Sequence, residues 1–145
     1  MISKLSFLAC LLVLTATRHA HAQRFVALGM PDSEVISVLQ KVQRAIAAGD
    51  RATIAGMVRY PLRVNHGPDD HSMITTRVEL LKRYDAVFTP EVRHAVGATS
   101  LNDVLGGVEG VALGRGEVWL TSTCAAERPR KCRLGLSSIN VRSKN

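Results

Sequence analysis

Residues 107–141 decide the fold of this chain, and they read GVEGVALGRGEVWLTSTC, AAERPRK and CRLGLSSINV. Apolar residues alternate with small or polar ones in three runs, a pattern typical of half-buried strands. The alternating positions are Val111 and Leu113, then Val118 and Leu120, then Leu134, Leu136, Ile139 and Val141. The pattern predicts three sheet strands, with a turn at Gly114-Arg115-Gly116 between the first two.

Two cysteines, Cys124 and Cys132, bracket the second turn of this stretch. Two cysteines in an oxidising compartment most simply form one disulfide. A loop this short gains about 2–3 kcal/mol from its closure. A metal or redox pair is the alternative, but no C-x-x-C spacing supports it. We therefore predict a hairpin whose two strands are tied by a Cys124–Cys132 disulfide.

The first 22 residues have the pattern of a secretory signal peptide. Lys4 lies in a short positive start, residues 5–16 are apolar, and Ala20-His21-Ala22 provides a small-x-small cleavage site. The apolar run is too short to span a bilayer comfortably. We predict that residues 1–22 are removed and that the protein is periplasmic or secreted. Lipidation at Cys10 is the alternative, but further apolar residues follow this cysteine.

The remaining chain, residues 23–145, has the length of a single domain that buries roughly two thirds of its unfolded surface. Because the leader carries Lys4 and Arg18 and no acidic residue, its removal lowers the net charge from +7 to +5. No second apolar run follows, so we expect no membrane span after cleavage.

The modest positive charge restricts the class of partner. Nucleic acid is a poor partner outside the cytoplasm, whereas acidic envelope polymers, phospholipid head groups or simply solvent suit such a surface. The glycines of the last third lack the strand–loop–helix context and the lysine of a phosphate-binding loop. We expect no cofactor, and a monomer or homodimer.

Helical patterns fill the chain before the strands. Residues 31–34 start a helix, an apolar stripe follows at helical spacing, and Gly49 ends it. The stripe consists of Val35, Val38, Leu39, Val42 and Ile46. Asp50 then caps a second helix, which carries Ile54, Met57 and Val58 and is stopped by Pro61 before a short strand at residues 62–64.

Two further helices are predicted before the strands begin. A capping box at Thr76 and Glu79 starts the first, and its expected buried face consists of Val78, Leu81, Tyr84 and Phe88. Thr89-Pro90-Glu91 starts the second, with Val92 and Val96 buried. Helices first and strands last is an α+β order.

This order resembles that of small exported bacterial proteins of the NTF2-like (SnoaL-like) superfamily. The resemblance rests on residues 60–64 (YPLRV), residues 84–92 (YDAVFTPEV) and residues 110–119, which contain GRGEVW. It implies a cone in which N-terminal helices pack on a curved C-terminal antiparallel sheet and enclose a cavity. It implies no reaction, because the superfamily hosts isomerases, hydratases, dehydratases, toxin-immunity proteins and plain binding domains. The acid and tyrosine arrangement of its steroid isomerases does not map onto this chain.

Four polar residues are candidates for chemistry. Asp85 becomes a general base if it faces the mouth of the cone and burial raises its pKa, and is otherwise a surface acid. His94 is the second acid–base candidate, with an exposed polar position as its alternative. His66 and His71 flank the HGPDDH loop and carry ligand atoms for zinc, nickel or copper, but their spacing matches no metal motif, so a solvated loop is favoured.

Larger side chains suggest two kinds of contact surface. Candidates for lining a ligand pocket are the aromatic residues Tyr60, Tyr84, Phe88 and Trp119, each of which is alternatively core. A basic tip on the disulfide loop is a candidate for docking an acidic partner, or else a solvated hairpin end. The tip consists of Arg128, Arg130, Lys131 and Arg133.

Three functions remain open from the sequence. The first is a non-enzymatic exported protein that binds a small apolar ligand or an envelope protein. The second is an isomerase or dehydratase with Asp85 or His94 as its acid–base residue, which requires that residue to face the cavity with a perturbed pKa. The third is an inhibitor or immunity protein acting through the disulfide loop.

The paired cysteines generate a prediction that needs no structure. Protein recovered from outside the cytoplasm should react with a thiol-alkylating reagent at neither Cys124 nor Cys132 until it is reduced. Mass spectrometry before and after reduction measures this. Alkylation of both cysteines without reduction would contradict the disulfide.

Overall fold

The structure is a computed structural model that describes residues 23–126 and 131–141. The predicted leader, Cys10, Arg128 and Arg130 therefore lie outside the described residues. Within these residues a short 3-10 turn, η1, precedes four helices and six strands. The helical elements are η1 (Val26–Leu28), α1 (Asp32–Ala47), α2 (Arg51–Met57), α3 (Arg77–Val87) and α4 (Pro90–Gly97). The strands are β1 (Val58–Asn65), β2 (His71–Ile74), β3 (Gly106–Gly107), β4 (Gly110–Leu113), β5 (Val118–Cys124) and β6 (Cys132–Asn140).

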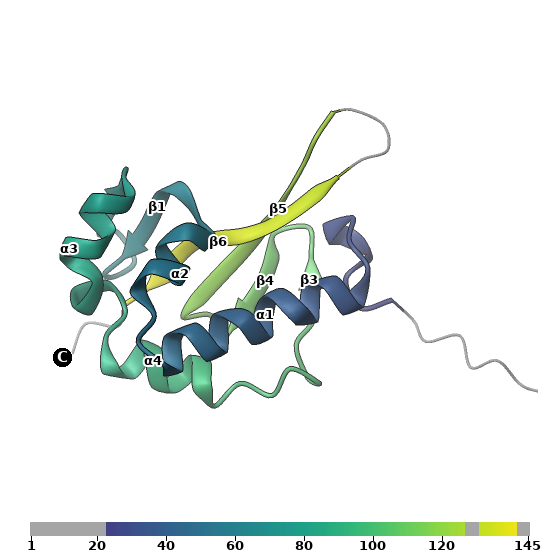
Figure 1. Cartoon of the computed structure of the whole chain (residues 1–145), viewed down its shortest axis with the longest axis horizontal. Helices are drawn as coiled ribbons and strands as arrows, with labels where there is room; N and C mark the ends of the chain where they lie inside the picture. The colour runs from purple at the N-terminus through teal and green to yellow at the C-terminus, as the bar shows by residue number, and fades with distance from the viewer. Residues whose placement is uncertain (1–22, 127–130, 142–145) are drawn as a thin grey trace, which may run out of the picture.

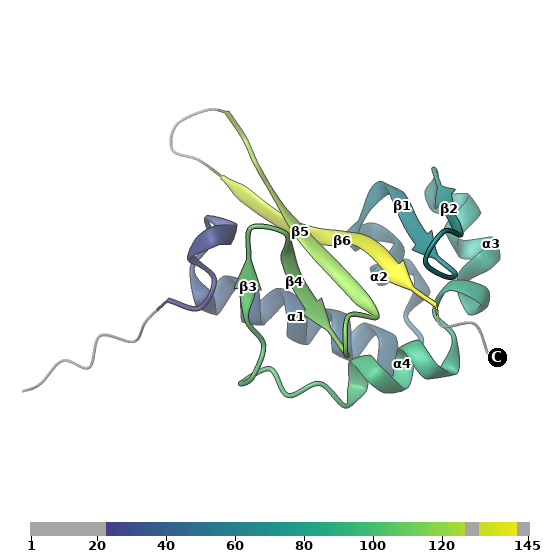
Figure 2. The ribbon, with the colours of Figure 1, turned by 180° about the vertical axis from the view of Figure 1, so that it is seen from behind.

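The strands form one open sheet in the order β2-β1-β6-β5-β4-β3. Helices α1 and α2 lie in front of it in Figure 1 and behind it in Figure 2, so they cover the same face. This confirms the α+β class. The sheet is mixed, however, because β1 runs parallel to β6 while the other neighbours are antiparallel. The expectation of a fully antiparallel sheet was wrong, since alternation within a strand carries no information about which strand lies beside it.

The predicted strands and turn of the last third are present. Strands β4, β5 and β6 form an antiparallel meander, and Leu113 and Val118 flank its first turn as partners. Gly114 and Gly116 occupy that turn with φ of 75° and 99°, a region that favours glycine. Cys124 and Cys132 are register partners with their sulfur atoms 2.04 Å apart, a disulfide distance.

Helix α1 begins within residues 31–34, as predicted, and buries the predicted stripe except for Val38, which is half-buried. Pro31 is the N-cap and makes no side-chain capping bond. The Asp32 carboxylate instead accepts hydrogen bonds from the backbone N–H groups of Arg24 and Phe25, at 3.0 and 3.1 Å. The acid therefore ties the lead-in segment to the helix rather than capping it.

Helix α2 ends earlier than predicted. Asp50 caps it by accepting a hydrogen bond from the N–H of Thr53 at 3.0 Å. The Thr53 hydroxyl also donates to this carboxylate, at 2.6 Å, and this second bond lowers the pKa of the Asp50 carboxyl. Val58 is already extended, with ψ of 137°, and begins β1. Pro61 lies within that strand and does not stop the helix. Val58 is buried as expected, but as a residue of strand β1 and not of the helix.

Helix α3 buries a face that matches the predicted one only in part: Tyr84 and Phe88 are buried as expected, and Leu81 is half-buried. Thr76 accepts a bond from the N–H of Glu79 at 3.2 Å, while the Glu79 carboxylate accepts from the N–H of Thr75. Leu80, Tyr84 and Val87 are buried, whereas Val78 is 61% exposed. Both sets have helical spacing, and only the position of the neighbouring elements selects between them. Helix α4 begins as predicted, with Thr89 as its cap and Val92 and Val96 buried.

The corrected face of α3 predicts the outcome of a matched pair of substitutions. Leu80→Ala should lower the free energy of unfolding by about 2–4 kcal/mol, because it leaves a cavity in the core. Val78→Ala should change it by less than about 0.5 kcal/mol, as for other surface sites. Urea denaturation measures both. Equal losses for the two variants would contradict the observed face.

Candidate functional site

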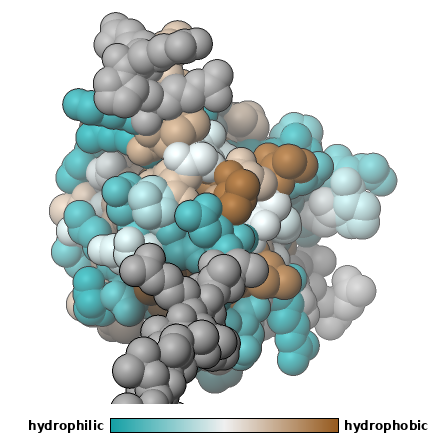
Figure 3. All heavy atoms as spheres, turned by 90° about the vertical axis from the view of Figure 1, so that its right-hand side faces the viewer, coloured by the Kyte–Doolittle hydropathy of each residue, from teal (hydrophilic) through white to brown (hydrophobic). Residues whose placement is uncertain are grey.

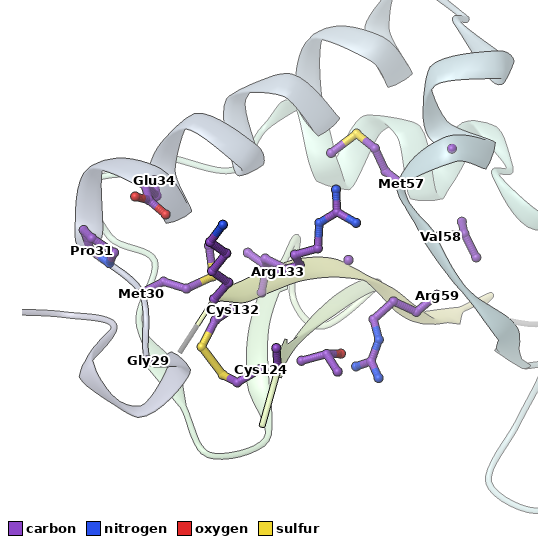
Figure 4. Close-up of a pocket in the computed structure, with 16 residues that line it drawn as sticks. Gly29, Met30, Pro31, Glu34, Met57, Val58, Arg59, Cys124, Cys132 and Arg133 are labelled. Carbon is purple, nitrogen blue, oxygen red and sulfur yellow. A yellow bond between two sulfur atoms is a disulfide. The ribbon is translucent and has the colours of Figure 1, made fainter. Parts of the chain in front are cut away.

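An open groove of about 1150 Å³ lies between the β5–β6 hairpin and the starts of α1 and β1. Residues of four segments line it, namely 29–31 with 34, 56–59, 123–125 and 131–135. Figure 4 shows the Cys124–Cys132 disulfide at one end and Met57 with Val58 at the other. It is larger than a second hollow, of about 240 Å³, that Trp119 lines.

The groove exists because the hairpin outreaches its neighbours. Strands β5 and β6 project past β1 and β4 (Figure 1). The N-terminal segment lies beside the hairpin, since the Ser122 hydroxyl donates to the carbonyl of Leu28 at 2.7 Å. Gly29 follows with φ of 66°, and a Cβ there would lie 3.1 Å from the sulfur of Cys132. Glycine thus allows the chain to turn closely around the disulfide before α1 begins.

Arg59 is held across the floor of the groove. Its side chain passes over β6 at Gly135, where an added Cβ would lie 2.7 Å from Arg59 Cγ. Its guanidinium donates to the Thr121 hydroxyl on β5 at 2.5 Å. Glycine at 135 is therefore required by the packing of an arginine stem, not by backbone conformation.

Basic side chains outnumber acidic ones along the groove. Among the described residues that line it, Arg59, Lys131 and Arg133 are basic and only Glu34 is acidic. Figure 4 shows Arg133 entering from β6 and Arg59 from β1. Apolar lining comes from Met30, Met57, Val58 and Leu134. Two members of the predicted basic tip, Lys131 and Arg133, thus belong to a concave surface rather than to an isolated loop.

Outside the groove, the surface on this side of the molecule is hydrophilic with scattered apolar groups (Figure 3). Figure 3 views the molecule from the side of η1 and the hairpin. Exposed apolar residues near this end are Val26, in η1, and Leu105 and Val108, which flank β3. Over the described residues, no helix combines the length and apolar character that crossing a membrane requires.

Neither acid–base candidate lies in the groove. The side chain of Asp85 is 63% exposed, and both of its carboxylate oxygens accept hydrogen bonds from the Arg51 guanidinium, at 2.9 and 3.0 Å. The Arg93 guanidinium lies 3.7 Å from the same carboxylate. His94 is exposed on α4. The condition under which Asp85 would act as a general base, a buried position facing the cavity, is not met.

The two histidine candidates for a metal site are separated by the β1–β2 turn. His66 Nε2 lies 3.1 Å from the Ser72 hydroxyl, and His71 is exposed at the start of β2. Within residues 23–126 and 131–141, no three His, Cys, Asp or Glu side chains are grouped to hold a metal ion. The HGPDDH segment is instead the connection of a hairpin, in which the N–H of His66 donates to the carbonyl of Asp70.

The four aromatic candidates have different surroundings. Tyr84 and Phe88 are buried and stack on each other with ring centroids 4.7 Å apart. Tyr60 is half-buried, and its hydroxyl donates to the carbonyl of Ala55 at 3.0 Å. Trp119 lines a second, smaller hollow of about 240 Å³, together with Asn65, Glu109, Thr121, Ser137, Ser138 and Asn140.

Sequence reasoning missed the helix-side wall of the groove. Met30, Glu34 and Met57 lie at the ends of two helices and follow no local motif. The available signal was indirect, because Met57 comes just before the strand that carries Arg59. The pairing of β1 beside β6 brings Met57 to the hairpin, and the bond of Ser122 to Leu28 brings the segment of Met30 and Glu34 there.

Comparison of the chain with protein-family models, curated proteins and solved structures gives no match. The site therefore has to be interpreted from its own geometry.

The two tyrosines generate a prediction about the core behind the site. Burial raises the pKa of Tyr84 and of Tyr60, so both stay neutral at pH 7. The Tyr84 hydroxyl is buried and has no hydrogen-bond partner among the described residues. Tyr84→Phe should therefore raise the free energy of unfolding by about 1 kcal/mol, since an unpaired buried polar group costs about 1–3 kcal/mol.

The matched control is Tyr60→Phe, which removes a made hydrogen bond and should lower the free energy of unfolding by about 0.5–1.5 kcal/mol. Both values come from urea denaturation at neutral pH. A loss for Tyr84→Phe as large as that for Tyr60→Phe would show that the Tyr84 hydroxyl has a partner in solution.

Proposed function

We propose that this protein is an exported, non-enzymatic binding protein with an NTF2-like domain, and that the groove beside the β5–β6 hairpin is its binding surface. The observation that carries the proposal is the groove itself. The groove has a volume of about 1150 Å³ and is lined by apolar side chains and three basic ones. The two acid–base candidates, Asp85 and His94, do not line it. Concave surfaces that combine apolar side chains with a few charged groups are a usual form of ligand site.

Export is supported by two independent features. The leader pattern of residues 1–22 is typical of secretion, and Cys124 and Cys132 lie at a disulfide distance. An NTF2-like domain is supported by helices packed on one face of an open six-stranded sheet. The parallel join of β1 to β6 departs from the wholly antiparallel sheet that the resemblance led us to expect.

The lining of the groove restricts its ligands. Met30, Met57 and Leu134 favour an apolar body, while Arg59 and Arg133 favour a negative group. Charge at the groove is only partly balanced by Glu34. A ligand or partner segment that is both apolar and anionic therefore fits better than a neutral or cationic one.

Anilinonaphthalene sulfonate, an apolar ring system with one sulfonate, tests this surface. Its fluorescence should rise saturably on titration into the mature protein. Arg59→Glu and Arg133→Glu should each weaken binding about tenfold, which corresponds to about 1.4 kcal/mol. Circular dichroism of each variant establishes that the fold is intact.

Arg63→Glu is the matched control, because Arg63 is also exposed on β1 but does not line the groove. It changes the net charge equally and should leave probe affinity within about twofold. Equal weakening by Arg63→Glu and Arg59→Glu, or no saturable binding, would refute the groove as the binding surface.

A further inference from the structure

Strand β6 is longer than the strand that pairs with it on one side. Strand β5 pairs with it from Cys132 onward, whereas β1 pairs with it only from Leu136. Among the described residues, Cys132–Gly135 therefore has a strand partner on its β5 side alone. The side without a strand faces the groove, and all four residues line it.

The backbone groups of this edge alternate in direction. The N–H of Ala125 donates to the carbonyl of Lys131 at 2.9 Å, so this pair is hydrogen-bonded across the hairpin. In an antiparallel ladder the next pair is not hydrogen-bonded and lies closer. That pair is Cys124 and Cys132, and its Cα atoms are 3.9 Å apart.

The same alternation continues along β6 into the groove. The N–H and C=O groups of Cys132 and of Leu134, two residues on, point away from β5. Leu136, the next residue in this series, is where β1 begins to pair. Cys132 and Leu134 thus present two N–H and two C=O groups where β1 would continue if it were longer.

An exposed edge of this kind recruits other strands unless it is protected. Lys131 and Arg133 flank it, and Arg59 lies at its far end. Basic side chains repel a basic strand, add no electrostatic attraction for a neutral strand, and attract an acidic strand. The edge is also pre-ordered, because the disulfide and the Ser122–Leu28 bond fix the hairpin, which lowers the entropy lost on binding.

We propose that an extended acidic segment of a partner protein adds to Cys132–Gly135 as an extra strand, in the manner of β-strand addition. This deepens the proposed function and rests on it. Leu134 is buried while its neighbour Arg133 is exposed. Since side chains alternate between the faces of a sheet, the added strand places its apolar residues on the face of Leu134 and its acidic residues on the face of Arg133.

An alternating valine–glutamate octapeptide, labelled with fluorescein, serves as the probe with the mature, oxidised protein. Fluorescence anisotropy should show saturable binding that weakens at least fivefold from 50 to 500 mM salt, because exposed charges are screened. A valine–lysine octapeptide should bind at least tenfold more weakly. In NMR spectra of the labelled protein, the amide signals of Cys132 and Leu134 should shift most.

Two variants separate strand addition from charge attraction alone. The same peptide N-methylated at alternate residues keeps its charge but cannot complete the ladder, and it should bind at least tenfold more weakly in at least one methylation register. Arg133→Glu should reduce binding of the unmodified peptide about tenfold, whereas Arg63→Glu should not. Undiminished binding of both N-methylated registers, or amide shifts confined to other strands, would overturn the proposal.

The outcomes also distinguish this inference from the proposed function. Saturable probe binding by anilinonaphthalene sulfonate without peptide binding would refute strand addition and leave the groove as a small-ligand site. Loss of both would refute the groove itself. Binding of the octapeptide with shifts at Cys132 and Leu134 supports both.

Discussion

The unequal pairing of β6 is the constraint on which the rest of the structure depends. This strand is tied to β5 along its whole length and to β1 only from Leu136. The full-length pairing projects a hairpin past the sheet, and the shorter pairing leaves a hollow beside it. Backbone N–H and C=O groups at a sheet edge need hydrogen-bond partners or water. The difference in pairing length that creates the hollow therefore also leaves backbone groups in it that can bind a further strand.

Polar contacts from distant parts of the chain keep the walls of the groove in place. The Asp32 carboxylate binds the N–H groups of Arg24 and Phe25, and the Arg24 guanidinium donates to the carbonyls of Leu101 and Asn102 at 3.0 and 2.7 Å. These bonds fix the lead-in segment against the loop before β3, while Ser122 joins it to the hairpin. The start of α1 is thereby held at the groove, where a freely moving segment would have to be ordered on each binding event.

Local patterns in the sequence were sufficient for most of the elements, though not for β2 and β3, and they did not determine which elements lie side by side. Alternation located β4, β5 and β6, hydroxyl and acid caps located the starts of α2, α3 and α4, and two cysteines located the tied hairpin. The parallel placement of β1 beside β6 and the buried face of α3 depend on tertiary packing, which neither period nor capping encodes. Lys131 and Arg133 were found as a basic tip, but Met30, Glu34 and Met57 join them only once the chain is folded.

Hydrogen exchange along β6 tests the central claim most directly. In the free, oxidised protein at neutral pH, the amides of Arg133 and Gly135 should exchange slowly because they face β5, and that of Leu136 should exchange slowly because it faces β1. The amides of Cys132 and Leu134 should exchange much faster, by at least about a hundredfold, since no strand within residues 23–126 and 131–141 covers them. Protection of Cys132 and Leu134 equal to that of Leu136 would show that the edge is already occupied and would contradict the account.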